Sequence, residues 1–173
     1  LRKGAPSVWP AAWGASQHAA FKKLQRALID KASLAAPNFS LPFEVLCDAS
    51  AAGIGAVLMQ SNAQGEKSVI EFYSKQLTDA ERKWCTAERE AFAIPTGLTK
   101  FRQYILMAQN FKVVVRSDHR GLTSLYKHAD DSSRLYRWAQ QLEDYDYKIE
   151  WLAGKSEQAM LPDGLSRARV LFN

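Results

Sequence analysis

Cysteine and histidine are scarce in this sequence: among 173 residues there are two cysteines, Cys47 and Cys85, and three histidines. Two cysteines are too few for the disulfide framework that holds small secreted domains together. The sequence has no CxxC pair and no cluster of cysteine and histidine, which argues against a zinc site. Cys47 lies in an apolar run and is expected to be a small buried hydrophobic residue. We therefore expect an intracellular, reducing setting.

Long apolar runs are missing as well. No stretch approaches the roughly 20 apolar residues of a membrane-spanning helix, and no signal-peptide pattern is present, so no membrane partner is expected. Hydrophobic residues make up 47% and charged residues 24% of the chain, which is typical of a globular protein and argues against disorder. The net charge of +5 is compatible with a polyanionic partner but does not require one.

Residues 1–42 are predicted to form a connector, and residues 43–173 a single domain. The sequence does not start with Met, so we expect it to come from a longer polypeptide. Breakers interrupt the first 14 residues, and a helical apolar stripe follows Ser16, which suits the N-cap position. Pro37 and Pro42 bracket a loop before the domain begins.

The domain has the pattern of a mixed α/β fold. Apolar runs predict five strands, at residues 43–48, 54–60, 68–74, 111–117 and 147–151. The Val-rich fourth strand is expected to be fully buried. Helical spacing predicts helices at about residues 88–105, 122–126, 135–145 and from 162 onward. The first three strands should form an antiparallel meander, and the fourth should lie parallel to the first through a helical crossover.

Two aspartates end predicted strands. Asp48 closes the first strand, and Asp118 follows the Val-rich strand. If these strands are parallel neighbours, both carboxylates emerge at the same edge of the sheet, where open α/β sheets place their sites. An aspartate that closes an apolar strand is costly unless it is solvated, paired or bound to a metal. The alternative interpretation is an ordinary strand-end aspartate that begins a turn.

Two further acids complete a candidate set. Glu90 lies at the margin of the apolar helical stripe and can reach the sheet edge, although Glu88 competes with it on spacing alone. Asp163 follows Pro162, so the alternative interpretation of Asp163 is a favourable charge in the first turn of a helix. Oxygen-only ligands favour Mg²⁺ or Mn²⁺, and such a site suits phosphodiester hydrolysis. The residue pattern thus indicates a candidate acidic metal site at the edge of an α/β sheet.

Five blocks of the sequence resemble the ribonuclease H domains of gypsy-type LTR retrotransposons, in that family's order. They are Phe43–Gln60, Phe72–Thr78, Thr86–Ile94, Ser117–Leu125 and Pro162–Arg167. The preceding stretch, from Trp9 to Phe43, is similar to the family's connector between polymerase and ribonuclease H. The resemblance implies a ribonuclease H-like five-stranded mixed sheet flanked by helices. It also implies the pol polyprotein of a retroelement reverse transcriptase as the source.

The resemblance identifies Asp48, Glu90, Asp118 and Asp163 as the catalytic and metal-binding carboxylates, with Glu90 preferred over Glu88. Asp48 would bridge two Mg²⁺ ions, for which Mn²⁺ can substitute. Glu90 and Asp118 would hold one ion, and Asp118 or Asp163 would assist with the other. The implied reaction cleaves the RNA strand of RNA–DNA hybrids and leaves 5′-phosphate and 3′-hydroxyl ends. The implied partners are the hybrid and the polymerase domain of the same polyprotein, in a cytoplasmic virus-like particle or the nucleus.

The sequence departs from this family at the helix that carries Glu90. Pro95 and Gly97 lie where good helix formers are usual. Because Pro95 cannot donate a hydrogen bond to the carbonyl of Ala91, the helix is predicted to kink or end there. The stretch before Asp163 contains no histidine, which cellular and retroviral ribonucleases H often carry there and gypsy-type domains generally lack. This stretch is also slightly longer than usual, so Asp163 is expected to be held less rigidly.

Contacts to the substrate are harder to predict. Three basic residues after the Asp118 block could touch phosphates, although a solvated basic face is the more ordinary interpretation of each: Lys127, Arg134 and Arg137. The backbone between Ser50 and Gly53 is a candidate for sensing RNA 2′-hydroxyls. Three aromatic residues on apolar stripes are predicted to pack in the core rather than stack on bases: Trp138, Tyr145 and Trp151.

The sequence pattern leaves two other functions to compare. The first is a ribonuclease H-like module that no longer cuts, either a structural part of a reverse transcriptase or a domesticated remnant. The complete set of four acids argues against it, and Pro95 argues mildly for it. The second is an integrase or transposase nuclease, whose sites typically carry Asp, Asp and Glu in that order. The order here is Asp, Glu, Asp, Asp, which does not fit.

Overall fold

The computed structural model describes residues 14–19, 21–22, 34–108, 110–122, 126, 130, 133–153 and 160–167. The chain divides into two compact units, Leu1–Ser33 and Leu34–Asn173. In the first unit the described residues 15–19 and 21–22 are helical. The predicted N-cap Ser16 therefore lies inside this helix, and most of the predicted stripe after it falls outside the described residues. No helix within the described ranges is long and apolar enough to span a membrane.

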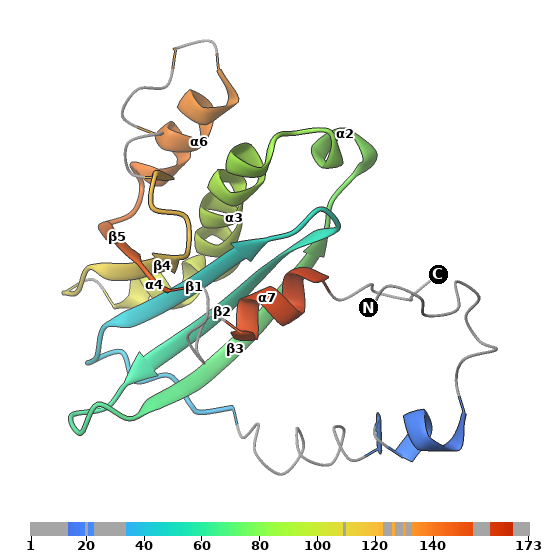
Figure 1. Ribbon diagram of the computed structural model, residues 1–173. Coiled ribbons are helices and arrows are strands. Elements are labelled where there is room, and N and C mark those ends of the chain that lie inside the picture. Colours follow the sequence, from blue (N-terminus) through green and yellow to red (C-terminus); the bar gives the residue numbers. More distant parts are fainter. Residues whose placement is uncertain are drawn as a thin grey trace. The chain divides into compact units, whose positions relative to one another are not determined.

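The second unit contains the expected five-stranded mixed sheet, whose strands lie in the order β3-β2-β1-β4-β5 (Figure 1). The strands are β1 Phe43–Ala49, β2 Gly53–Ser61, β3 Lys67–Gln76, β4 Val113–Ser117 and β5 Tyr147–Trp151. The first three form an antiparallel meander. Strand β4 pairs parallel to β1, and β5 pairs parallel to β4. The carboxyl ends of β1, β4 and β5 therefore share one edge of the sheet.

Helices cover both faces of this sheet (Figure 1). They are α2 Asp79–Arg82, α3 Thr86–Lys100, α4 Arg102–Met107, α6 Arg134–Leu142 and α7 Met160–Arg167. The larger core lies between the sheet and α3, where the predicted stripe of Ala91, Ile94, Leu98, Phe101 and Ile105 is buried. The smaller core lies on the other face, where Leu165 of α7 packs against Leu46, Val57 and Met59. The predicted short helix at 122–126 lies mostly outside the described residues.

Strand β4 is shorter and less buried than predicted. It begins at Val113 because Phe111, which is partly exposed, precedes it in a turn. Its side chains alternate between buried and half-buried positions, so the prediction of a fully buried strand was wrong. The half-buried positions include Arg116, which forms ion pairs with Glu44 and Glu150 on the neighbouring strands. These ion pairs allow a charged residue in an otherwise apolar strand.

Helix α3 passes through Pro95 without interruption and ends five residues later, at Lys100. Of the predicted kink or end at Pro95, the early end is therefore wrong, and a kink stays a prediction. The break comes at Phe101, where φ −95° and ψ 11° separate α3 from α4. Gly97 has a packing role, because a Cβ at that position would lie 2.9 Å from the Sγ atom of Cys47. Its lack of a side chain lets α3 lie close against β1.

Helix α7 is seated directly on β2. A Cβ at Gly55 would lie 2.8 Å from the backbone nitrogen of Ser166 and closer still to the carbonyl oxygen of Pro162. A glycine inside a strand often marks such a close approach of another backbone. Gly55 therefore fixes the depth at which α7, and Asp163 in its first turn, sits against the sheet.

Residues 34–42 pack with the sheet. The backbone N–H of Ala35 donates to the carbonyl of Val69, 2.8 Å away. The side-chain amide of Gln60 donates to the carbonyl of Asn38 and accepts from its N–H. These residues belong to the second compact unit although they precede β1. The predicted division between connector and domain at residue 42 stays a prediction.

Candidate active site

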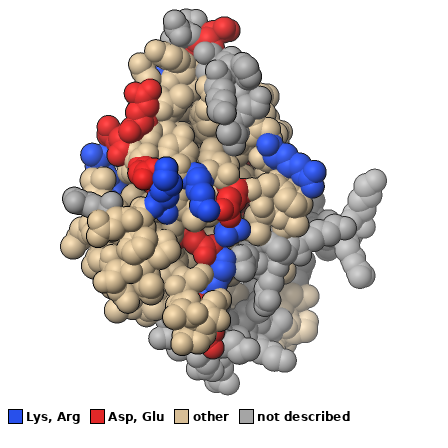
Figure 2. All heavy atoms as spheres, turned by 90° about the vertical axis from the view of Figure 1, so that its left-hand side faces the viewer, with Lys and Arg blue, Asp and Glu red and all other residues tan. Residues whose placement is uncertain are grey.

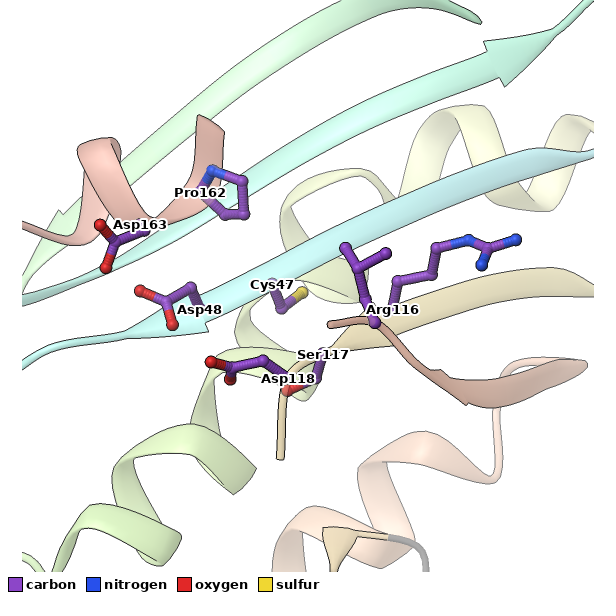
Figure 3. A pocket seen from close by; sticks show the side chains of 8 residues that line it. Cys47, Asp48, Arg116, Ser117, Asp118, Pro162 and Asp163 are labelled. Carbon is purple, nitrogen blue, oxygen red and sulfur yellow. The ribbon is translucent and has the colours of Figure 1, made fainter. Parts of the chain in front are cut away.

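Three aspartates line one pocket at the carboxyl edge of the parallel strands (Figure 3). Asp48 lies near the end of β1, Asp118 directly follows β4, and Asp163 lies in the first turn of α7. Cys47 and Ser117 contribute to the same lining. Cys47 is buried as predicted. The parallel pairing of β1 and β4 brings the two strand-end carboxylates to one edge, as the sequence pattern indicated.

Glu90 stands beside this pocket on α3. Its side chain is only 15% exposed, and the charges of Asp118 and Asp48 act on it. Glu88 is engaged elsewhere, because its Oε1 atom lies 2.6 Å from Arg134 Nη2 and its Oε2 atom accepts from the N–H of Cys85. Of the two glutamates, Glu90 is therefore the one whose carboxylate is electrostatically coupled to the aspartates.

Neighbouring carboxylates raise the pKa of Asp48 and of Glu90. Burial is the largest cause that raises the pKa of Asp48, and the charges of Asp118 and Asp163 raise it further. A hydrogen bond from the hydroxyl of Ser166 to Asp48 Oδ2, at 2.6 Å, opposes this shift. Burial also raises the pKa of Glu90, with smaller contributions in the same direction from Asp118 and Asp48. Such repulsion is what a bound cation would relieve.

Glu90 has an unusual local environment. Its Oε2 atom is buried and accepts no hydrogen bond from the described residues. His119 Nδ1 lies 2.7 Å from it, and the nearby imidazole lowers the pKa of Glu90. No hydrogen bond is aligned between them, so the contact is electrostatic. This buried carboxylate oxygen, which has an electrostatic partner but accepts no hydrogen bond from the described residues, suits a metal ligand.

The four acids suit a hard divalent cation chemically, since all of them offer carboxylate oxygens. The positions of these carboxylates are less favourable for binding one ion. No three His, Cys, Asp or Glu side chains in the described part of the chain are grouped closely enough to hold one ion. Asp163 is paired with Arg167, whose Nε donates to Oδ1 at 2.6 Å. Metal binding would therefore require the carboxylates to turn away from such local partners.

The turn between β1 and β2 is held together by Ser50. Its Oγ atom accepts from the N–H groups of Ala52 and Gly53 at 3.0 and 3.1 Å, and it donates to the carbonyl of Ser166 at 2.6 Å. Two of the backbone donors in this turn are therefore already engaged. A role of Ser50 and Gly53 in sensing 2′-hydroxyls stays a prediction.

The predicted basic contacts differ in availability. The guanidinium of Arg134 pairs with Glu88 and lies 4.9 Å from the ring centroid of Trp84. Arg137 is exposed, and Lys127 lies outside the described residues. A phosphate contact by any of the three stays a prediction.

Trp138 and Tyr145 are buried in the larger core, as predicted, but the same prediction for Trp151 was wrong. Trp151 is 47% exposed because it ends β5, the edge strand of the sheet. Its indole N–H donates to the carbonyl of Asp118 at 3.0 Å, and the guanidinium of Arg120 lies 4.1 Å from its ring centroid. Arg120 was not among the predicted contacts. Its place two residues after Asp118 is the sequence signal that could have found it.

Comparison with known proteins gives a consistent result. Residues 38–145 match the model of the RNase H-like domain found in reverse transcriptase. The chain is 35% identical to the retrovirus-related Pol polyprotein from transposon 412 of Drosophila melanogaster, over 93% of the chain and 12% of that protein. It is 30% identical to the corresponding polyprotein from transposon gypsy of the same fly, over 93% of the chain and 15% of that protein. The chain thus spans a small fraction of the curated relatives it matches.

Solved structures share the fold. A foamy viral protease–reverse transcriptase in complex with RNA/DNA hybrid aligns with a TM-score of 0.58 and 18% identity, over 93% of this chain and 21% of that one. RNase H1 from the archaeon Halobacterium salinarum aligns with a TM-score of 0.50 and 12% identity, over 72% of this chain and 93% of that one. The mixed sheet of this chain is therefore an RNase H fold. Together with the gypsy-type relatives, the match of residues 38–145 shows that the chain belongs to the RNase H-like domain family of reverse transcriptases.

Proposed function

We propose that this chain cleaves the RNA strand of RNA–DNA hybrids during reverse transcription and leaves 5′-phosphate and 3′-hydroxyl ends. The observation that carries the proposal is the convergence of Asp48, Asp118 and Asp163 from three separate elements on one pocket, with Glu90 coupled to them electrostatically. Carboxylates with a purely structural role are not expected to converge in this way, because like charges at short range disfavour joint ionisation.

In this proposal the four carboxylates hold two Mg²⁺ ions, for which Mn²⁺ can substitute. Bound ions of this kind make a nucleophile from water and stabilise the leaving oxygen. Asp48 is central, since it is the acid on which the charges of both other aspartates act. Ser166 keeps Asp48 oriented through its hydroxyl, and Asp163 is presented by the first turn of α7.

Related proteins support the choice of substrate and partner. The foamy viral enzyme with the same fold was solved in complex with RNA/DNA hybrid. The fly relatives are Pol polyproteins, of which this chain covers 12% in the case of transposon 412. We propose that the partner of this domain is the polymerase of the same polyprotein, and that it works in a cytoplasmic virus-like particle or in the nucleus.

Binding to phosphates is expected to be modest. Positive and negative side chains are interspersed on the face shown in Figure 2, so the net charge of +5 does not gather there. Binding that rests on few phosphate contacts is weak and falls steeply with salt. The polymerase would then supply many of the contacts that bind the hybrid.

A catalytically weak or inactive module is the second candidate function. It is favoured by one observation, that no three ligand side chains in the described ranges are already grouped for a single ion. The two candidates predict opposite results in a cleavage assay.

The test incubates the full chain with 5′-labelled RNA in three forms: annealed to DNA, annealed to RNA, and single-stranded. A labelled DNA duplex is added as a fourth substrate, all with Mg²⁺. We expect cleavage of the hybrid RNA alone, with products that a polymerase can extend from their 3′-hydroxyl ends. Absence of cleavage with both Mg²⁺ and Mn²⁺ would instead support the structural module, and equal cleavage of all four substrates would refute hybrid selectivity.

A further inference from the structure

Helix α3 lacks one of its internal hydrogen bonds. In an α-helix the N–H of each residue donates to the carbonyl four residues earlier. Pro95 has no N–H, so it leaves the carbonyl of Ala91 without its helical donor. Ala91 is fully buried, and Pro95 is buried too. Water therefore has poor access to this carbonyl, and an unsatisfied buried acceptor would be costly.

The missing donor is replaced from another part of the chain. The hydroxyl of Tyr126 donates a hydrogen bond to the carbonyl of Ala91. Tyr126 is half-buried and packs against the larger core. Burial raises the pKa of this phenol, so its hydroxyl keeps the proton that it donates. The helix can thus pass through Pro95 and continue to Lys100.

This hydrogen bond lies next to the candidate active site. Ala91 directly follows Glu90, and Tyr126 follows β4 in the same stretch as His119. His119 contacts Glu90 at 2.7 Å, so α3 is held to this stretch at two successive residues. One of these contacts is the electrostatic pair, and the other is the tyrosine hydrogen bond.

We infer that Tyr126 is a positioning residue that replaces the donor lost at Pro95 and thereby holds Glu90 at the metal site, an inference that rests on the proposed function. The two residues form a matched pair. Pro95 creates the need for an external donor, and Tyr126 supplies it. The loss of stability on removing the Tyr126 hydroxyl therefore depends on which residue occupies position 95.

A double-mutant cycle tests this dependence. The full chain is compared with Tyr126→Phe, Pro95→Ala and the double variant, by thermal unfolding in EDTA. We expect Tyr126→Phe to lower Tm by about 3–8 °C when Pro95 is present. In the Pro95→Ala background, the N–H of the new alanine takes the carbonyl of Ala91. Tyr126→Phe should then lower Tm by less than about 2 °C.

The matched control is Tyr104→Phe. Tyr104 is another half-buried tyrosine, and its ring packs at 6.2 Å from that of Phe43. Loss of its hydroxyl should change Tm by no more than about 1 °C in either background. Equal losses of Tm from Tyr126→Phe in both backgrounds would show that Tyr126 does not replace the donor of Pro95.

A second readout distinguishes positioning of Glu90 from a purely structural role. Binding of Mn²⁺ is measured by calorimetry for the same four proteins. Tyr126→Phe should weaken Mn²⁺ binding about 3–10-fold, and the double variant should regain most of the wild-type affinity. A coupled Tm with unchanged Mn²⁺ affinity would overturn the positioning role.

The two proposals can fail separately. If the wild-type chain neither cleaves hybrid nor binds Mn²⁺, the proposed function fails and so does the role of Tyr126 toward Glu90. The stability cycle in EDTA requires no activity, so it still decides whether Tyr126 replaces the donor of Pro95.

Discussion

Asp118→Asn is expected to reduce hybrid cleavage by about 10³-fold or more while the metal-free protein stays at least as stable as the wild type. Asparagine has nearly the same shape, so packing should survive the change. The metal site loses a charged ligand, and the transition state loses the stabilisation that depends on it. Cleavage is measured on labelled hybrid at saturating Mg²⁺, and stability by thermal unfolding in EDTA.

The stability result follows from the charges around Asp118. Its charge is among the causes that raise the pKa of Asp48 and of Glu90. When folding raises the pKa of an acid, the folded protein loses stability as the pH rises through that raised pKa, because the acid must then ionise in an unfavourable environment. Removing Asp118 therefore favours the folded protein at neutral pH, by no more than about 1 kcal/mol because Asp118 is exposed and screened. The gain should vanish at acid pH, where both neighbours are protonated.

Asp146→Asn is the matched control for this experiment. Asp146 precedes β5 and so lies at the opposite edge of the sheet, where it pairs with the exposed Lys112. Its loss should leave cleavage unchanged. If Asp118→Asn retained near-normal cleavage, Asp118 would not belong to the site. A large loss of stability in EDTA would instead mean that protein partners satisfy its charge.

Gly55→Ala is expected to have the largest effect on stability. The new Cβ would lie 2.8 Å from the backbone nitrogen of Ser166 and would overlap the carbonyl of Pro162. Neither is the end of a flexible side chain, so α7 must lift from β2. We expect the free energy of unfolding to fall by about 3 kcal/mol, which lowers Tm by about 6–12 °C. Because Asp163 moves with α7, cleavage should fall about 10²-fold in the protein that remains folded.

Gly164→Ala provides the contrast within the same helix. A Cβ at Gly164 meets no atom within 4 Å. Alanine there should stabilise α7 by about 0.5–1 kcal/mol without affecting cleavage, because glycine is a poor helix former. Thermal unfolding and hybrid cleavage of both variants test the seating of α7. Wild-type Tm and activity for Gly55→Ala would show that α7 does not lie against β2 as described.

Much of the site could be predicted because its parts are local in sequence. The apolar runs that end at Asp48 and Asp118 locate two strands, and the helical crossover between them makes the strands parallel. Because the two strands run in the same direction, both acids lie at the same edge of the sheet. The choice of Glu90 over Glu88 needed the resemblance, since spacing alone treats them equally. The structure supplies a physical reason that spacing lacks: Glu88 is engaged by Arg134.

The errors came from features set by tertiary contacts. The alternation of residues along β5 predicted a buried Trp151. However, β5 is the edge strand of the sheet, and the alternation does not reveal where a strand lies in the sheet. The penalty expected at Pro95 was real, but the compensating donor, Tyr126, lies 35 residues away from the carbonyl it serves. Gly55 was not singled out in the sequence, because its role depends on α7, which lies far from it along the chain.

The most direct test of the proposed function compares wild type with Asp48→Asn on labelled RNA–DNA hybrid, in Mg²⁺, in Mn²⁺ and in excess EDTA. The charges of Asp118 and Asp163 both act on Asp48, so loss of the Asp48 carboxylate should reduce cleavage more than loss of either other aspartate. We predict that the wild type cuts the RNA strand with either metal and not in EDTA, and that Asp48→Asn cuts under none of these conditions. Cleavage that persists in EDTA, or that survives in Asp48→Asn, would contradict metal-dependent catalysis by this cluster of carboxylates.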